Sequence, residues 1–272
     1  NDFAGILQKY EADVKVQYLA VNMDLQYPVT LTRDKIRTAF NSWRDLEEFI
    51  NGIVNALYNG AYIQRYEATK GLVLAAYKGN NIQYETVSAV ADESTAKALV
   101  EKIRATFSKM QIPSTKYNAW NKVKGGELTL KTWSDPQDII VMISADVEAN
   151  VSVDVLAAAF NMDKADFMGR LHLIDDWTSF DNERFDIIRA NSDGLEEVTS
   201  TELGLMADVK AVLLDEDWFQ VYDNNNKFTE KYVASGLYWN YFYHVWKTIS
   251  HSPFANAVVF VTSSATITAP AS

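Results

Sequence analysis

The chain has 272 residues, enough for one large domain or two interlocked lobes, and its 48% hydrophobic and 22% charged residues exclude disordered, collagen-like and coiled-coil proteins. A net charge of −11 without any basic cluster argues against tight binding of nucleic acid through its phosphates. Without cysteine there can be no disulfide or thiolate metal site, and the longest apolar stretches fall well short of the roughly 20 residues that span a membrane.

The first predicted element is an extended β arm. Between Asp13 and Thr30 apolar residues alternate with polar ones over most of the segment, which is the pattern of a strand with one covered face. The alternation breaks near Asn22–Asp24 and the segment closes around Pro28.

A long helix is predicted next. Thr32 suits an N-cap, and apolar residues then recur every three or four positions as far as the stop at Gly79–Asn81. An unbroken helix from Arg33 to Lys78 would be about 70 Å long. Three glycines instead predict a kink or break: Gly52, Gly60 and Gly71.

The middle of the chain alternates between strand and helix patterns. The expected elements are a strand at Gln83–Val90, a helix at Asp92–Met110, a surface hairpin at Trp120–Trp133 around Gly125–Gly126, a buried strand at Asp138–Ser144, a helix at Val153–Phe160, and strands at Leu171–Trp177 and Phe185–Arg189. Two strand runs follow within Val209–Tyr222, and a last strand lies at Asn256–Thr262. This order predicts a mixed α+β or α/β fold without internal repeats.

Both ends suggest a longer protein. Asn1 is not an initiator methionine, so we expect a processed form or the ordered part of a longer chain. From Thr262 to Ser272 the composition changes to Ser, Thr, Ala and Pro, which is typical of a linker leaving a domain.

The search for catalytic and metal-binding residues finds no site. The histidines, His172, His244 and His251, have no metal-ligand spacing, and we interpret them as buried or interfacial. Glycine-rich phosphate-binding motifs and the GxSxG nucleophile motif are absent. We therefore predict no catalytic residue, no metal and no cofactor.

Acidic residues at predicted turns allow a functional and a structural interpretation. Asp175–Asp176 ends an apolar strand, where many α/β sites present carboxylates, but the start of a turn before Thr178–Ser179 is the favoured interpretation. Asp215–Asp217 predicts a tight solvated turn or bulge between strands. Asp223–Asn226 lacks the glycine and the final glutamate of a calcium loop, so that site is not predicted.

Aromatic residues concentrate near the C-terminus. The members of this aromatic block are Tyr232, Tyr238, Trp239, Tyr241, Phe242, Tyr243 and Trp246. The run is apolar on every side, which predicts burial all round, in a core or against a partner subunit. A sugar-binding platform would instead require several of these rings to be exposed.

Four segments resemble major capsid proteins of tailed bacteriophages, including the small podovirus type. They are Val21–Phe40 (VNMDLQYPVTLTRDKIRTAF), Val153–Arg170 (VDVLAAAFNMDKADFMGR), Ala211–Asp223 (AVLLDEDWFQVYD) and Gly236–Phe260, with GLYWNYFYHVW followed by SPFANAVVF. Their order along the chain agrees as well, and the resemblance covers most of the sequence.

The resemblance implies the Hong Kong 97-type capsid fold, an α+β fold with an extended β arm, a peripheral domain with a long spine helix beside a β-sheet, and an axial domain near the symmetry axes. On this basis we expect residues 1–31 to form the extended β arm as part of the extended loop, 32–112 and 200–262 the peripheral domain, and 113–199 mainly the axial domain. Residues 263–272 would be a linker, which in some relatives leads to an immunoglobulin-like module.

The same resemblance implies a major head protein that self-assembles into the icosahedral shell around a phage genome. Its partners would be copies of itself in hexamers and pentamers, with scaffold, portal and decoration proteins in addition. It implies a virion protein, assembled in the bacterial host cytoplasm, that encloses DNA without sequence-specific binding, does not enter a membrane and is not an enzyme. The negative net charge fits, because a shell must not adsorb its packed DNA strongly.

Three other functions remain open at this point. An encapsulin-like compartment shares the fold. A carbohydrate-binding or tail-fibre-type protein would expose Trp239 or Trp246 to glycans. A hydrolase would use Asp175 and Asp176.

Overall fold

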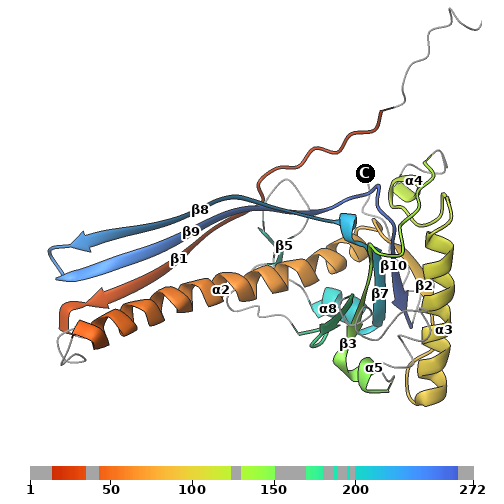
Figure 1. Cartoon of the computed structure of the whole chain (residues 1–272), viewed down its shortest axis with the longest axis horizontal. Coiled ribbons are helices and arrows are strands. Elements are labelled where there is room, and N and C mark those ends of the chain that lie inside the picture. The colour runs from red at the N-terminus through yellow and green to blue at the C-terminus, as the bar shows by residue number, and fades with distance from the viewer. Residues whose placement is uncertain are drawn as a thin grey trace, which may run out of the picture.

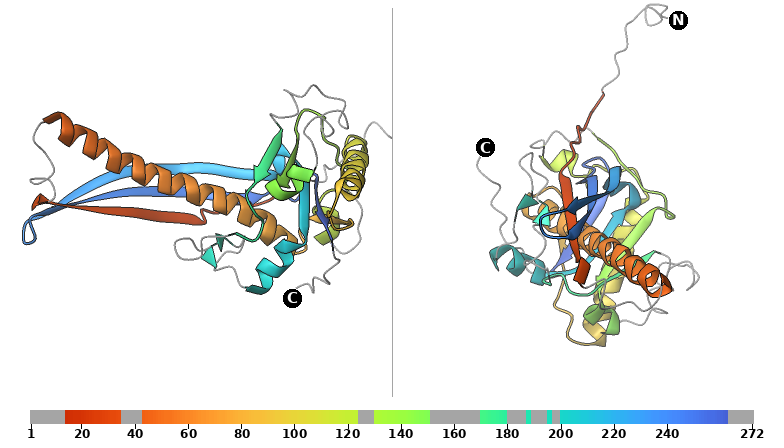
Figure 2. Two further views of the ribbon diagram at one scale, coloured as in Figure 1. Left: turned by 90° about the horizontal axis from the view of Figure 1, so that it is seen from below. Right: turned by 90° about the vertical axis from the view of Figure 1, so that its left-hand side faces the viewer.

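The computed structural model describes residues 14–34, 43–123, 130–150, 170–179, 187–188, 195–196 and 200–262. These residues form a long arm and a body, with the arm extending to the left of the body in Figure 1. Figure 2 shows the same arrangement from below and from the tip of the arm.

The arm combines one long helix with a three-stranded sheet. The helix is α2 (Trp43–Lys78), and the antiparallel strands β1 (Met23–Thr32), β9 (Tyr238–His251) and β8 (Phe219–Val233) lie in the order β1-β9-β8. The predicted strand at Asp13–Thr30 is therefore confirmed from Met23 onwards. Figure 1 shows α2 running along the sheet from the tip of the arm into the body.

The kink predicted from the glycines of α2 is wrong, because the helix is continuous over 36 residues. At about 1.5 Å per residue it is roughly 54 Å long. Its predicted end at Lys78 is confirmed: the Gly79 N–H donates to the Ala75 carbonyl (2.9 Å), and Asn80 takes the left-handed conformation (φ 57°) that commonly ends helices. The part of the prediction at residues 35–42 lies outside the described residues.

The body is built on a five-stranded sheet in the order β2-β10-β7-β3-β4. Its strands are β2 (Gln83–Thr86), β10 (Ala257–Val261), β7 (Val209–Asp215), β3 (Ile139–Ser144) and β4 (Leu171–Ile174). The helices around it are α3 (Glu93–Met110), α4 (Trp120–Val123), α5 (Ala145–Asn150) and α8 (Ser200–Ala207), with the short hairpin of β5 (Ile187–Ile188) and β6 (Leu195–Glu196) and the 3-10 turn η2 (Glu216–Trp218).

The five-stranded sheet is covered on both faces at its centre, which explains why the inner strands β10 and β3 are almost entirely apolar. In β10, Val258 and Phe260 lie in one core cluster with residues of α3, whereas Val259 and Val261 lie in the other with residues of α2. This alternation follows from the two-residue period of a strand. The end of α2 is thus part of the core of the body.

The predicted helix at Asp92–Met110 is confirmed as α3, and its start is fixed by a capping box. The Asp92 carboxylate accepts the Thr95 N–H (2.8 Å), and the Thr95 hydroxyl accepts the Asp92 N–H (3.0 Å). These bonds satisfy backbone groups that the first turn leaves without helical partners. The buried strand predicted at Asp138–Ser144 is also confirmed, as β3.

Other expectations differ from the structure or fall outside it. The segment predicted as a hairpin, Trp120–Trp133, begins with the short helix α4, and its residues 124–129 lie outside the described residues. So does the helix predicted at Val153–Phe160. Strands β3 and β4 of segment 113–199 share one sheet with β2, β7 and β10.

Within one chain the aromatic block is only partly buried, so of the two predicted settings the core of the chain does not cover it completely. Most of the block lies in β9, the central strand of the arm sheet, where Tyr241 and Phe242 are half-buried and Trp239 is 38% exposed. A strand turns successive side chains to opposite faces, so only alternate residues of the block can face α2.

Candidate functional site

Tyrosine rings connect the helix and the sheet in the middle of the arm. The Tyr27 hydroxyl of β1 donates a hydrogen bond to Gln64 of α2, and its ring lies beside Gly60, where a Cβ atom would be 3.7 Å away. Tyr243 of β9 meets Tyr58 of α2 edge to face, with 4.9 Å between ring centroids. Burial raises the pKa of Tyr27 well above its usual value, so the phenol stays protonated as the donor in this contact.

Towards the tip, aromatic side chains on this same face of the sheet become accessible. Tyr232 of β8 is paired with Trp239 of β9, with 4.9 Å between their rings, and Phe228 stacks on Tyr241 at 5.8 Å. Trp239, Tyr241 and Tyr243 face the same way because they are two residues apart. We name the exposed aromatic side chains of these two strands the distal aromatic surface: Phe228, Tyr232 and Trp239.

The exposure of the distal aromatic surface is large for apolar side chains. Phe228 and Tyr232 are each more than 40% exposed, and Trp239 is 38% exposed. Contiguous exposed aromatic side chains of this kind mark contact surfaces with other macromolecules.

A second exposed apolar region is the N-terminal segment, residues 14–22. Val14, Val16 and Tyr18 are 73%, 56% and 92% exposed, and the segment leaves the arm at the upper side of Figure 1. It is attached at its end by Asn22, whose side chain bonds the Ile249 carbonyl (2.6 Å) and N–H (2.9 Å). The segment therefore joins the rest of the chain at the body end of the arm, opposite the tip.

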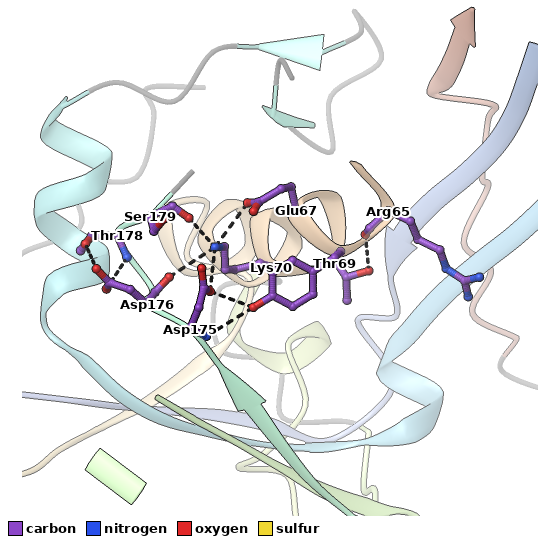
Figure 3. Close-up of polar contacts among 9 residues, drawn as sticks. Arg65, Glu67, Thr69, Lys70, Asp175, Asp176, Thr178 and Ser179 are labelled. Atoms are coloured by element: carbon purple, nitrogen blue, oxygen red, sulfur yellow. Dashed lines mark hydrogen bonds and ion pairs between the residues drawn. The ribbon is translucent and has the colours of Figure 1, made fainter. Parts of the chain in front are cut away.

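Where α2 enters the body, a buried lysine joins it to the loop after β4 (Figure 3). The Lys70 ammonium lies 3.2 Å from the Asp175 carboxylate and 3.3 Å from the Glu67 carboxylate, and its side chain is completely buried. It also donates to the backbone carbonyls of Asp176 (3.3 Å) and Ser179. We name these five residues the Lys70 cluster.

Tyr66 adds a hydrogen bond to the Lys70 cluster, from its hydroxyl to the Asp175 carboxylate (2.8 Å). Partial burial of Asp175 raises its pKa. Hydrogen bonds from the Asp176 N–H and the Tyr66 hydroxyl, together with the charge of Lys70, lower the pKa by more, so that it lies below the usual range for Asp. Burial, with the hydrogen bond to Asp175, raises the pKa of Tyr66 to about 12. The Lys70 cluster therefore attaches α2 to the loop after β4 through ion pairs and hydrogen bonds.

The pair Asp175–Asp176 does not form a joint carboxylate site. Asp176 accepts the N–H (2.9 Å) and the hydroxyl (2.7 Å) of Thr178, so the predicted turn is confirmed there. Asp175 is engaged instead by Lys70 and Tyr66.

The other two acidic segments also have structural roles. Asp215 begins the turn η2 and accepts the Asp217 N–H (3.0 Å), but it is only 8% exposed, so the expectation of a solvated turn is wrong for this residue. Burial raises the pKa of Asp215. Asp223 lies in β8 at a bulge and pairs with Lys247, with 2.7 Å between carboxylate and ammonium.

The histidines lie in three different environments. His172 is in edge strand β4, His244 stacks on Trp246 in β9 (5.6 Å between rings), and His251 is buried against Trp218 (5.2 Å). Within the described ranges no group of three or more His, Asp or Glu side chains could hold a metal ion. No helix in these ranges is long and apolar enough to cross a membrane.

His251 gives a testable pH dependence. Burial lowers its pKa from 6.5 to about 4, so the folded chain binds the proton less readily than the unfolded chain. Neutral His251 therefore contributes fully to the free energy of unfolding above pH 6.5, and this contribution is lost as the pH falls towards 4. Between pH 7 and pH 5 the loss is about 2 kcal/mol. Urea unfolding at pH 7 and pH 5 measures how much each protein's free energy of unfolding falls between the two. We expect this fall to be about 2 kcal/mol smaller in H251F than in the parent, with H244F in the same strand as the control. An equal fall in H251F and the parent would show that His251 does not cause the pH dependence.

Comparisons with known proteins agree with these observations. Residues 3–261 match the model of the Phi29-like phage major capsid protein family. The chain is 37% identical over 259 residues to the major capsid protein of Bacillus phage PZA and 35% identical over 262 residues to that of Bacillus phage B103. Each alignment covers 94% of this chain and 50% of the relative, so the chain spans about half the length of these curated relatives.

Solved phage structures share the fold. A chain of the Staphylococcus phage Andhra capsid superposes with a TM-score of 0.67 at 15% identity, covering 89% of this chain and 70% of its own length. A chain from the head fiber and inner core protein structure of bacteriophage P68 superposes with a TM-score of 0.63 at 14% identity, covering 97% and 76%. The predicted Hong Kong 97-type capsid fold is thereby confirmed. The chain belongs to the Phi29-like phage major capsid protein family.

Proposed function

We propose that this chain is the shell-forming part of a phage major capsid protein, and that its copies assemble into the icosahedral shell enclosing the phage genome. The observation that carries the proposal is the presence of two exposed apolar regions at opposite ends of the arm. These are the N-terminal segment at the body end and the distal aromatic surface at the tip. Surfaces so far apart in one chain can be covered by different neighbours, and such head-to-tail contacts extend into rings and shells.

The shell would consist of hexamers and pentamers of this protein, with scaffold, portal and decoration proteins as further partners. It would be assembled in the cytoplasm of the bacterial host and would become part of the virion. The net charge of −11 suits a wall that encloses DNA without sequence-specific binding. The protein would have no catalytic role, in keeping with the structural use of Asp175 and Asp176 in anchoring and turning the chain.

We also propose a division into domains. Residues 32–112 and 200–262 would form the peripheral domain, in which the spine helix α2 lies beside β8 and β9, and residues 113–199 would be mainly the axial domain. Residues up to 31 would belong to the extended loop, and residues 263–272 would be a linker to a further module.

The test is assembly of the full-length protein, expressed with any neighbouring scaffold gene and studied by sedimentation and negative-stain electron microscopy. We expect closed icosahedral particles or curved sheets. A protein that remains a monomer or dimer at every concentration and salt condition would contradict the proposal.

A further inference from the structure

The side chain of Trp133 is held outwards by the rigid backbone around it. Its neighbours point inwards: the Thr132 hydroxyl donates to Asn256 (2.5 Å), and the Asn256 amide donates to the Ser134 hydroxyl (2.9 Å). The Thr132 backbone also exchanges two hydrogen bonds with Ser114, of 2.9 and 3.0 Å. Trp133 is nevertheless 60% exposed, whereas Ser134 and Asn256 are at most 3% exposed. Its exposure is therefore imposed by a buried hydrogen-bond network.

Further apolar and charged side chains surround Trp133. A cleft of about 430 Å³ is lined by Trp133, Phe254, Lys131 and Asp217 among others. Ile112, which follows α3 by two residues and precedes the bridge between Ser114 and Thr132, is 64% exposed. We name Ile112, Trp133 and Phe254, with Lys131 and Asp217 at the rim, the Trp133 patch.

The charges at the rim favour a second copy of this chain as the occupant. Two copies that each carry a net charge of −11 repel one another, so their contacts require surfaces with few charges or with charges of both signs. At its rim the Trp133 patch offers one cation, Lys131, and one exposed anion, Asp217, beside an apolar centre, because the second carboxylate of the cleft, Asp215, is only 8% exposed. A tryptophan at the centre of such a surface is the side chain that most often dominates binding between proteins.

We propose that the Trp133 patch is a contact surface between copies of this chain, with Trp133 as the buried anchor and Lys131 of one copy paired with Asp217 of another. The inference rests on the proposed self-assembly, but the patch belongs to the body and is separate from the distal aromatic surface. The patch lies in the segments that follow α3, precede β3, follow β7 and precede β10, and Figure 1 places these elements at the end of the molecule opposite the tip of the arm.

The first test replaces the anchor. We expect W133A in the full-length protein, co-expressed with the scaffold, to raise the concentration required for assembly by about tenfold or more. The matched control is L173A, at a 51% exposed side chain of β4 that lies outside the Trp133 patch, and we expect it to assemble like the parent. Urea unfolding checks that both variants are folded.

The second test exchanges the charges. We expect K131E and D217K each to assemble poorly alone, and an equimolar mixture of the two to recover assembly, because each copy then meets an opposite charge on its neighbour. Recovery in the mixture identifies a contact between copies, since a contact within one chain could not be restored by mixing.

The outcomes separate the two proposals. If the parent forms no particles, the proposed function itself is overturned. If the parent assembles and W133A assembles at the same concentration, only the Trp133 patch is overturned as a contact between copies. If the mixture of folded charge variants assembles no better than either alone, the pairing of Lys131 with Asp217 is overturned.

Discussion

Replacing Lys70 with alanine is expected to lower the free energy of unfolding by about 3 kcal/mol. The substitution leaves Glu67 and the carbonyls of Asp176 and Ser179 without the ammonium that they contact. Breaking a buried ion pair from one side typically destabilises a protein by about 3–5 kcal/mol. We expect the lower value, because the side chain of Asp175 is 52% exposed and can be solvated again. Urea unfolding followed by circular dichroism measures the change.

A matched control and a second substitution make this prediction specific. K116M removes an exposed lysine and is expected to change stability by less than about 0.5 kcal/mol. Adding D175N to K70A removes an orphaned charge, so the double variant should be less unstable than the sum of the two single variants. Additive losses, or a K70A protein as stable as the parent, would refute the anchoring role of Lys70.

Replacing Tyr232 with serine is expected to abolish or strongly weaken assembly while the subunit stays folded. Tyr232 is 44% exposed on the distal aromatic surface, and its ring contact with Trp239 contributes only about 1 kcal/mol to folding. Burial of the same ring against a neighbour can contribute about 2 kcal/mol or more to each contact, and a shell repeats the contact many times. Sedimentation velocity of the full-length protein under assembly conditions measures the assembled fraction.

The control for this prediction lies in the same strand. Tyr222 of β8 is 50% exposed, but it is paired with Thr248 and therefore lies on the opposite face of the sheet from Tyr232. We expect Y222S to assemble nearly as well as the parent. Equal assembly of both variants would remove the distal aromatic surface from the contacts of the shell.

Local patterns were sufficient to predict several elements of the fold. The capping residue Asp92 and the apolar spacing that follows it place α3 correctly. The stop at Gly79–Asn81 places the end of α2, and an apolar run identifies β3. In each case the signal lies within a few residues of the element, where backbone propensity and hydrophobic periodicity act directly.

Features that depend on distant residues could not be predicted in this way. Lys70 is surrounded in sequence by an ordinary helix, and its burial depends on Asp175, 105 residues away. The glycines of α2 disfavour a helix locally, but packing against both sheets outweighs an intrinsic penalty of about 1 kcal/mol for each. The accessibility of Tyr232 and Trp239 depends on which strands pair and on which face the helix covers, neither of which is encoded in the apolar run itself.

The exposed position of Trp133 was also hidden in the sequence. Thr132 and Ser134 are short polar residues that would be typical of an irregular loop, and only their bonds to Asn256 reveal a fixed backbone. The one available signal was the alternation of residues around a tryptophan, which predicts opposite directions for neighbouring side chains but not which of them is buried.

The continuity of α2 has a mechanical consequence. Because one helix extends from the tip into the core of the body, the arm behaves as a lever whose fulcrum is close to the Lys70 cluster. With roughly 40 Å of helix between Lys70 and Trp43, a rotation of about 5° at the fulcrum would displace the tip by about 3.5 Å. Small adjustments within the body of one subunit are thus magnified at its far end, where a neighbouring subunit would feel them.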